Sequence, residues 1–120
     1  MANGVITNPN KASTFTPTVS KTSGNSSVYS AEGARSGNIC SLSIMFTNGS
    51  DTSEGSNSFV GTITNAPLPL VDANGIGFYG SHFFAATLKT TGAITVRVIT
   101  GGGYWAAADR HGIAIMYICA

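Results

Sequence analysis

Apolar and polar residues alternate with a period of two along much of the chain. In residues 38–47, Cys40, Leu42, Ile44 and Phe46 share one parity, and Ser41 and Ser43 lie on the other. Successive side chains of a β-strand point to opposite faces, so this alternation predicts a strand with one buried and one exposed face.

Further strand patterns follow the same rule, and short turn sequences separate them. The predicted strands cover residues 38–47, 58–64, 75–80, 82–89, 93–100 and 112–120, with a weaker one at 26–31. The separators "TNGSD", "DANG", "TTG" and "TGGG" are rich in residues that favour turns. No segment repeats apolar residues with helical spacing over three turns. About seven or eight short strands predict an all-β protein, an antiparallel β-sandwich or jelly roll.

The last predicted strand is apolar on both parities. One parity holds Ile113, Ile115, Tyr117 and Cys119, and the other holds Ala114, Met116 and Ile118. A strand of this kind lies centrally in its sheet, or faces a subunit interface as well as the core.

The chain divides into a polar start and a β-rich remainder. Residues 1–25 have no long apolar run, and they are interpreted as an extended arm, a linker, or an irregular first strand around 15–19. Residues 26–120 form the β-sandwich domain, and 120 residues suffice for one core.

Charge is scarce. Only 9% of residues are charged and the net charge is +1, whereas about 25% is typical of soluble domains. The electrostatic field of so few charges is weak, which makes nucleic acid and anionic lipid poor partners. A surface with so few charges can also be partly buried in a homo-oligomer, which we expect here. No apolar run of about 18 residues is present and the start lacks a secretory pattern, so we expect neither membrane insertion nor a signal peptide.

Metal and cofactor chemistry is not indicated. Cys40 and Cys119 lie in apolar runs, and we interpret them as reduced, buried thiols rather than a disulfide. Residues 48–57 offer oxygen ligands of the kind Ca²⁺ prefers, but the spacing matches no EF-hand and a hydrophilic hairpin loop explains it equally. We therefore predict no metal and no cofactor.

Catalysis is not indicated either. His111, Asp109 and a serine could be combined on paper into a triad, but no serine lies in a nucleophile elbow. The five acidic residues all lie in turn-like segments rather than across an aromatic cleft. The sequence predicts a protein that is not an enzyme.

The segment "TGGGYWAAADR" at 100–110 is the main candidate binding loop. It lacks the helix and the Lys–Ser/Thr pair of a phosphate-binding loop. Tyr104, Trp105, Asp109 and Arg110 combine aromatic faces with charged hydrogen-bonding groups, which suits a saccharide. The alternative is that Trp105 fills the end of the sandwich while Asp109 and Arg110 pair with each other or across an interface.

A second candidate rim lies at 72–82. It contributes Tyr79 and His82 on a glycine-flanked turn. Loops at one end of a sandwich cluster, so this rim and the 100–110 segment could form one surface.

Four segments together resemble the C-terminal β-sandwich head domain of bacteriophage tail-fibre and baseplate receptor-binding proteins. They are "YSAEGARSGNICSLSIMFT", "GTITNAPLPL", "LKTTGAITVRVIT" and the terminal "IAIMYICA", and the resemblance covers residues 25–120. It implies a homotrimeric head at the phage tail tip, made in the host cytoplasm, that recognises a host cell-surface glycan.

From this we expect a receptor-binding head that binds a bacterial saccharide without catalysis. Three weak sites on one trimer give avidity without high single-site affinity. Two alternatives stay open. One is a purely structural virion or assembly domain that trimerises. The other is a secreted lectin-like module, favoured if Cys40 and Cys119 are bridged.

Overall fold

The computed structural model describes residues 12–48, 53–79, 82–100 and 110–120, and these form nine strands. The strands are β1 (Ser13–Phe15), β2 (Thr18–Ser23), β3 (Ser26–Ser36), β4 (Ile39–Asn48), β5 (Asn57–Thr64), β6 (Ala73–Tyr79), β7 (His82–Leu88), β8 (Ala93–Thr100) and β9 (Arg110–Ile118). No helix occurs among the described residues. The predicted all-β antiparallel class is confirmed.

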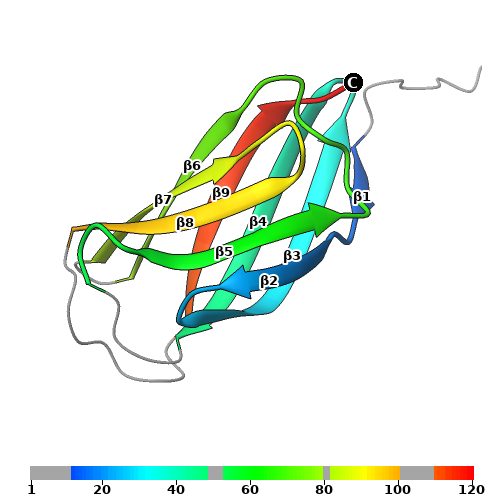
Figure 1. Ribbon diagram of the computed structural model, residues 1–120. Coiled ribbons are helices and arrows are strands. Elements are labelled where there is room, and N and C mark those ends of the chain that lie inside the picture. Colours follow the sequence, from blue (N-terminus) through cyan, green and yellow to red (C-terminus); the bar gives the residue numbers. More distant parts are fainter. Residues whose placement is uncertain (1–11, 49–52, 80–81, 101–109) are drawn as a thin grey trace, which may run out of the picture.

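All nine strands belong to one hydrogen-bonded sheet that curls into a half-barrel (Figure 1). The order across the sheet is β1-β3-β4-β9-β6-β7-β8-β5-β2, and every neighbouring pair is antiparallel. The sequence predicted a sandwich or jelly roll, but the strands do not divide into two separate sheets. Because the single sheet curls, the half with β4 and β9 faces the half with β5 and β8. The core lies between these two halves, as it would between the two sheets of a sandwich.

The two edge strands show how far the sheet curls. β1 and β2 stand at opposite ends of the strand order, yet only Thr16 and Pro17 join them along the chain. Three peptide steps reach about 11 Å at most, so the two edges lie close together. Pro17 is buried at this seam, where its lack of an N–H suits a position outside the hydrogen-bonded ladder.

The core lies on the concave side of the sheet, where the inward parity of each strand is apolar. The rings of Phe46 and Phe59 meet across it with centroids 4.9 Å apart. Sixteen buried apolar residues form the cluster: Cys40, Leu42, Ile44, Phe46, Phe59, Ile63, Phe84, Ala86, Leu88, Ile94, Val96, Val98, Ile113, Ile115, Tyr117 and Cys119. The alternation predicted for 38–47 and 93–100 is confirmed.

β9 is central, as its composition predicted, between β4 and β6. Its inward parity is buried, but its outward parity is not: Met116 is 71% exposed and Ile118 is 51% exposed. The inward apolar residues of β9 are therefore explained by the core, whereas its outward apolar residues lie on an exposed face of the sheet.

Two inward-facing glycines let β6 lie close to β9. A Cβ atom on Gly77 would collide with the backbone carbonyl oxygen of Gly112, and one on Gly75 with that of Ala114. Only hydrogen fits at these positions, which explains the "NGIGF" pattern of this strand.

Part of the 1–25 segment belongs to the sheet. Ser13–Phe15 pairs with β3, and Thr18–Ser23 pairs with β5, which matches the strand alternative for this segment. Residues 1–11, interpreted as an arm or linker, lie outside the described residues. The described part of the chain holds no helix with the length and apolar character needed to pass through a membrane.

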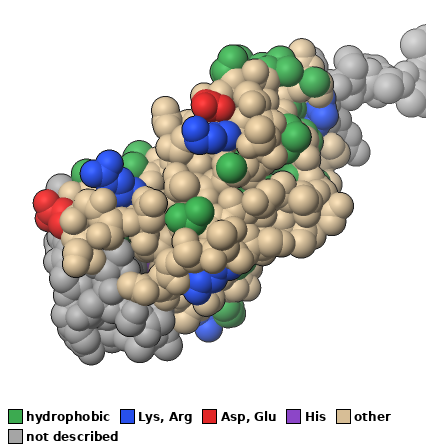
Figure 2. Space-filling model, viewed as in Figure 1, with side chains coloured by type: hydrophobic (Ala, Val, Ile, Leu, Met, Phe, Trp, Pro, Cys, Tyr) green, Lys and Arg blue, Asp and Glu red, His purple; other side chains and the backbone are tan. Residues whose placement is uncertain are grey.

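Most of the surface in Figure 2 belongs to uncharged polar side chains and backbone, with basic side chains well separated. On this half of the sheet several outward positions are polar, among them Thr62, Thr95 and Arg97, while Ile99 is an exposed apolar one. Here the scarcity of charge is offset by hydroxyl groups that water can solvate.

Candidate functional site: the loop end of the sheet and its outer face

Three loops emerge at the same end of the sheet. The registers Thr47↔Arg110, Tyr79↔His82 and Phe83↔Thr100 bring together the ends of β4, β6 and β8 and the starts of β7 and β9 (Figure 1). We call this region the loop end.

Of the predicted 72–82 rim, only the turn between Tyr79 and His82 lies at the loop end, beside the limits of the 100–110 segment. The rest of that rim is not a turn: Ala73–Tyr79 form β6, whose first residue pairs with Leu88 at the opposite end of the sheet.

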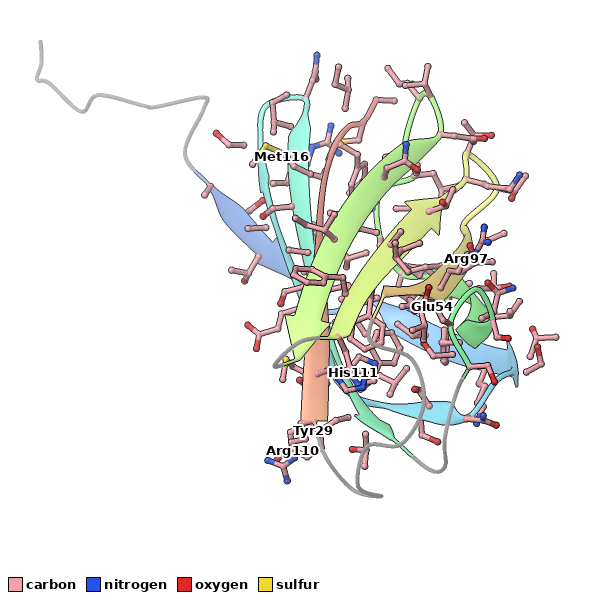
Figure 3. The ribbon with its side chains drawn as sticks, turned by 90° about the vertical axis from the view of Figure 1, so that its left-hand side faces the viewer. Tyr29, Glu54, Arg97, Arg110, His111 and Met116 are labelled. Carbon is pink, nitrogen blue, oxygen red and sulfur yellow. The ribbon has the colours of Figure 1, made fainter. Side chains whose placement is uncertain are left out.

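Three of the predicted binding residues, Tyr104, Trp105 and Asp109, lie outside the described residues. Both interpretations of Trp105 therefore stay predictions. Arg110 is described: it is the first residue of β9 and is exposed. Its guanidinium carbon lies 3.8 Å from the centroid of the Tyr29 ring (Figure 3).

Tyr29 reaches this position through a β-bulge. The register of β3 on β4 runs from Val28↔Phe46 to Ser30↔Met45, so Tyr29 is an extra residue without a partner position. A bulge bends the strand and changes the direction of the extra side chain. Tyr29 is 55% exposed as a result. The sequence indicated only a weak strand here, and nothing in "SSVYSA" signals the bulge.

The Tyr29–Arg110 pair has the chemistry of a recognition site. A guanidinium over an aromatic face is held by the cation–π attraction, which is about 0.5–1 kcal/mol at exposed sites. Stacking fixes the plane of the guanidinium without using its N–H donors, which remain at its edge. The pair thus offers directed donors beside an exposed aromatic ring, as a sugar requires.

The second predicted rim is only partly described. Tyr79 ends β6 opposite His82, the first residue of β7. The side chain of Tyr79 lies outside the described residues. His82 is partly exposed and lies near enough to His111 to influence it electrostatically. His82 stands at the loop end, and its role in binding stays a prediction.

His111 is a core residue rather than an exposed general base. Its ring stacks between Phe84, at a centroid distance of 4.5 Å, and Phe46, at 5.4 Å, and the residue is 2% exposed. Burial, with a smaller effect of His82, lowers its pKa to about 4, so the ring is neutral at pH 7. A ring enclosed in this way offers no access to a substrate in solvent.

The two cysteines lie at the opposite end of the sheet from Arg110, buried and next to each other. No disulfide joins them in the structure, and their reduced state stays a prediction. Burial, and then the neighbouring Cys119, raise the pKa of Cys40 to about 11, so it stays protonated and unreactive. Burial also raises the pKa of Tyr117, whose hydroxyl donates to the Pro67 carbonyl at 2.8 Å.

The described residues contain no group of three or more His, Cys, Asp or Glu side chains that could hold a metal ion. Part of the hydrophilic segment 48–57 lies outside them. Its described end is tied to β8, where Arg97 Nε donates to the Gly55 carbonyl at 3.1 Å and Gly55 N–H donates to the Val98 carbonyl at 2.7 Å. β4 and β5 are not neighbours in the sheet, so this segment is a crossover between them, and the predicted hairpin loop is wrong.

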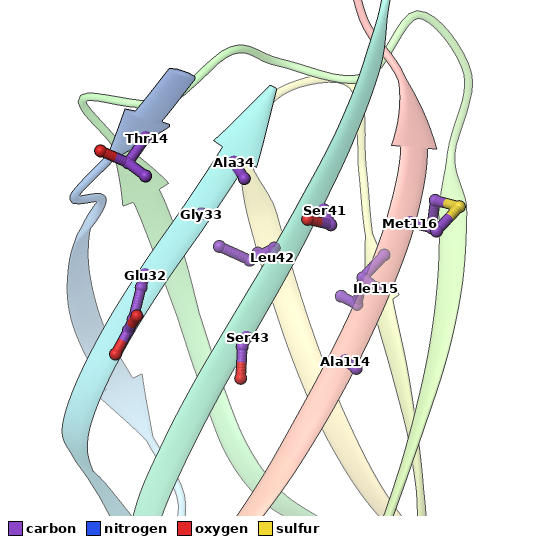
Figure 4. Close-up of a pocket in the computed structure, with 10 residues that line it drawn as sticks. All are labelled: Thr14, Glu32, Gly33, Ala34, Ser41, Leu42, Ser43, Ala114, Ile115 and Met116. Carbon is purple, nitrogen blue, oxygen red and sulfur yellow. The ribbon is translucent and has the colours of Figure 1, made fainter. Parts of the chain in front are cut away.

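A second surface, not found from the sequence, lies on the outer face of the sheet. A trough of about 410 Å³ crosses β3, β4 and β9 (Figure 4). Four small side chains cover its floor, and we call it the serine–alanine trough: Ala34, Ser41, Ser43 and Ala114. Met116 forms one wall, while Glu32 and Thr14 form the other.

Compared with protein-family models, with curated proteins and with solved structures, the chain shows no match. What it does is therefore argued from the two surfaces just described.

Proposed function

We propose that this protein is a phage receptor-binding head domain that binds a bacterial cell-surface saccharide without catalysis, as a homotrimer at the tail tip. The observation that carries the proposal is the exposed Tyr29–Arg110 pair at the loop end. It adds an aromatic face and a fixed guanidinium to the end from which the 100–110 segment and the Tyr79–His82 turn emerge.

Two further features agree with this proposal. The fold is an antiparallel all-β domain, which is compatible with the resemblance to the phage heads. The surface carries little charge, which suits a neutral glycan better than a polyanion. The secreted lectin-like module stays an alternative, since Cys40 and Cys119 lie next to each other, and a thiol count under denaturing conditions tests it.

Binding of the fluorescently labelled protein to intact bacteria and to a glycan array tests the proposal. We expect Tyr29→Ala and Arg110→Ala each to weaken saccharide affinity about tenfold, which corresponds to about 1.4 kcal/mol. The control is Lys89→Ala, which removes one positive charge from an exposed position at the opposite end of the sheet and should leave affinity unchanged. Tyr104, Trp105 and Asp109 are changed to Ala in the same series.

The outcomes separate the alternatives. If Tyr29→Ala and Arg110→Ala bind as the unmodified protein does, the pair is not part of the site. If the unmodified protein binds no cell surface and no glycan, the receptor-binding function is wrong. The structural virion or assembly domain is then favoured, and the exposed apolar side chains of β9 are the observation on its side.

A further inference from the structure

The outer face of β3, β4, β9, β6 and β7 differs from the outer face of the other half of the sheet. On β5 and β8 the outward residues include Thr62, Thr95 and Arg97. On β6 and β9 they include Ile76, 72% exposed, and Met116, 71% exposed. Both are sheet faces turned away from the core, so folding alone does not require the second one to be apolar.

Four large apolar side chains of this face follow one another along β4, β9 and β6, and we call them the apolar ridge: Ile39, Ile76, Met116 and Ile118. Phe83 of β7, 53% exposed, lies on the same face nearer the loop end. Ile39 stands directly opposite Ile118 in the register of β4 on β9, and Ile76 stands opposite Ala114 in that of β6 on β9. Leu70, whose N–H donates to the Ile118 carbonyl at 2.9 Å, extends the ridge past the end of β9.

The serine–alanine trough lies beside the apolar ridge on the same face. Met116 forms the wall of the trough on the β9 side (Figure 4), and Ile76 of β6 stands opposite Ala114 of the trough floor. One face therefore carries both a protruding apolar element and a recess floored by small side chains. The apolar ridge of a second copy could fill the trough of the first copy, and the trough of a further copy could accept the first copy's ridge.

The size and charge of the face agree with a protein partner. Strands lie about 4.8 Å apart and each residue adds about 3.4 Å, so five strands over seven residues cover on the order of 600 Å². Side-chain relief adds to this, and a standard interface needs about 800 Å² per partner. Within the strand bounds, charge on this face is confined to its margins: Glu32 at the trough rim, Arg110 at the loop end, and Arg35 beside Ile39 and Met116 at the other end.

We propose that copies of this chain associate through this face, with the apolar ridge of one copy inserted into the serine–alanine trough of the next. A contact between two different patches is heterologous, and it closes into a ring when the rotation between copies allows. This inference rests on the homotrimer of the proposed function and names the surface that forms it.

The first test is the mass of the full chain in solution, measured by light scattering after size exclusion. We expect a trimer of about 37 kDa from chains of 12.2 kDa. Ile76→Lys and Met116→Lys should reduce it to a monomer, because each buries a charge in an apolar contact. The matched control is Ile99→Lys on β8, where Ile99 is 43% exposed outside this face; it should stay a trimer.

The second test identifies the contact directly. Ala34→Cys, in the trough, and Ile76→Cys, on the ridge, lie three strand spacings apart in one chain, about 14 Å. A disulfide requires Cα atoms within about 7 Å, so this pair can bridge only between copies. A mixture of the two single variants should form a mixed disulfide under oxidation, while buried Cys40 and Cys119 stay free. Circular dichroism of every variant establishes that it is folded.

Each outcome is decisive. An unmodified protein that is monomeric, or an Ile76→Lys variant that is folded and still a trimer, overturns the inference. A cross-linked dimer in place of a trimer upholds the face and contradicts the homotrimer. Saccharide binding is measured separately at Tyr29 and Arg110, so loss of either proposal leaves the other intact.

Discussion

At the scale of single residues, neighbours along the chain can face quite different surroundings. Arg110 and His111 are adjacent in sequence, yet Arg110 is exposed against Tyr29 while His111 is enclosed by Phe46 and Phe84. The pleat of β9 separates them, since successive side chains point to opposite faces. Two adjacent residues thus have different roles: Arg110 contributes to the surface at the loop end, and His111 contributes to the core.

The enclosed His111 makes stability depend on pH. Below about pH 6.5 the unfolded chain binds a proton at this ring, but the folded chain does not until its pKa of about 4. Protons therefore favour the unfolded state in this window, and stability falls by about 1.4 kcal/mol per pH unit, about 3 kcal/mol in total.

His111→Phe isolates this effect, because a phenyl ring keeps the stacked arrangement and removes the titrating group. Urea unfolding at about pH 7 and about pH 4.5 should show the unmodified protein losing about 2–3 kcal/mol more than the variant between the two conditions. Carboxylates titrate equally in both proteins, so they cancel. Equal losses would mean that His111 keeps an ordinary pKa in the fold.

At the scale of strands, close approach of two backbones decides which residues fit. β6 packs against β9 through Gly75 and Gly77, whose missing side chains admit the carbonyl groups of Ala114 and Gly112. On the opposite parity of the same strand, Ile76 is exposed. On its inward side, β6 therefore has glycines that allow close contact with β9. On its outward side it places a large apolar side chain on the surface.

Gly77→Ala should be strongly destabilising, since its methyl group collides with backbone that no rotamer change can move. We expect a loss of about 1–3 kcal/mol or more in the free energy of unfolding, measured by urea titration. Thr62→Ser, at an exposed outward position of β5, is the control and should change stability by less than about 0.5 kcal/mol. A Gly77→Ala protein as stable as the control would show that β6 can move away from β9 without penalty.

At the scale of the whole molecule, the scarcity of charge governs how the protein meets a partner. With a net charge of +1, long-range attraction contributes little, and the contact surface itself has to supply affinity. We therefore expect binding to bacterial cells to change less than about twofold between about 0.01 and 0.15 M salt.

A copy of the chain extended by a polylysine tail provides the positive control, because its binding should weaken steeply over the same salt range. A steep salt dependence of the untagged protein would point to a polyanionic partner instead of a neutral glycan.

What could be predicted from the sequence follows from what periodicity encodes. Alternation predicted the strands and the inward parity of β4 and β8, and the apolar residues on both parities of β9 predicted its central place, since each depends on local pattern. It did not give a single curled sheet, because strand order depends on pairings between distant segments. Nor did it give the Tyr29 bulge, which is one extra residue in a register that only the partner strand defines.

The seam between β1 and β2 has a consequence for how the chain folds. These strands come first in the sequence, but β2 pairs with β5. Thr18 therefore pairs with Thr64, a residue far along the chain. The pairing of β4 with β9 is longer still, joining Ile39 to Ile118. Loop-closure entropy has to be overcome before such distant pairs form, so folding on the millisecond-to-second scale is expected. We expect the hairpin β3–β4 and the three-stranded meander β6–β7–β8 to form early, because their pairings are local. The approach of the two edge strands, β1 and β2, is expected to come last.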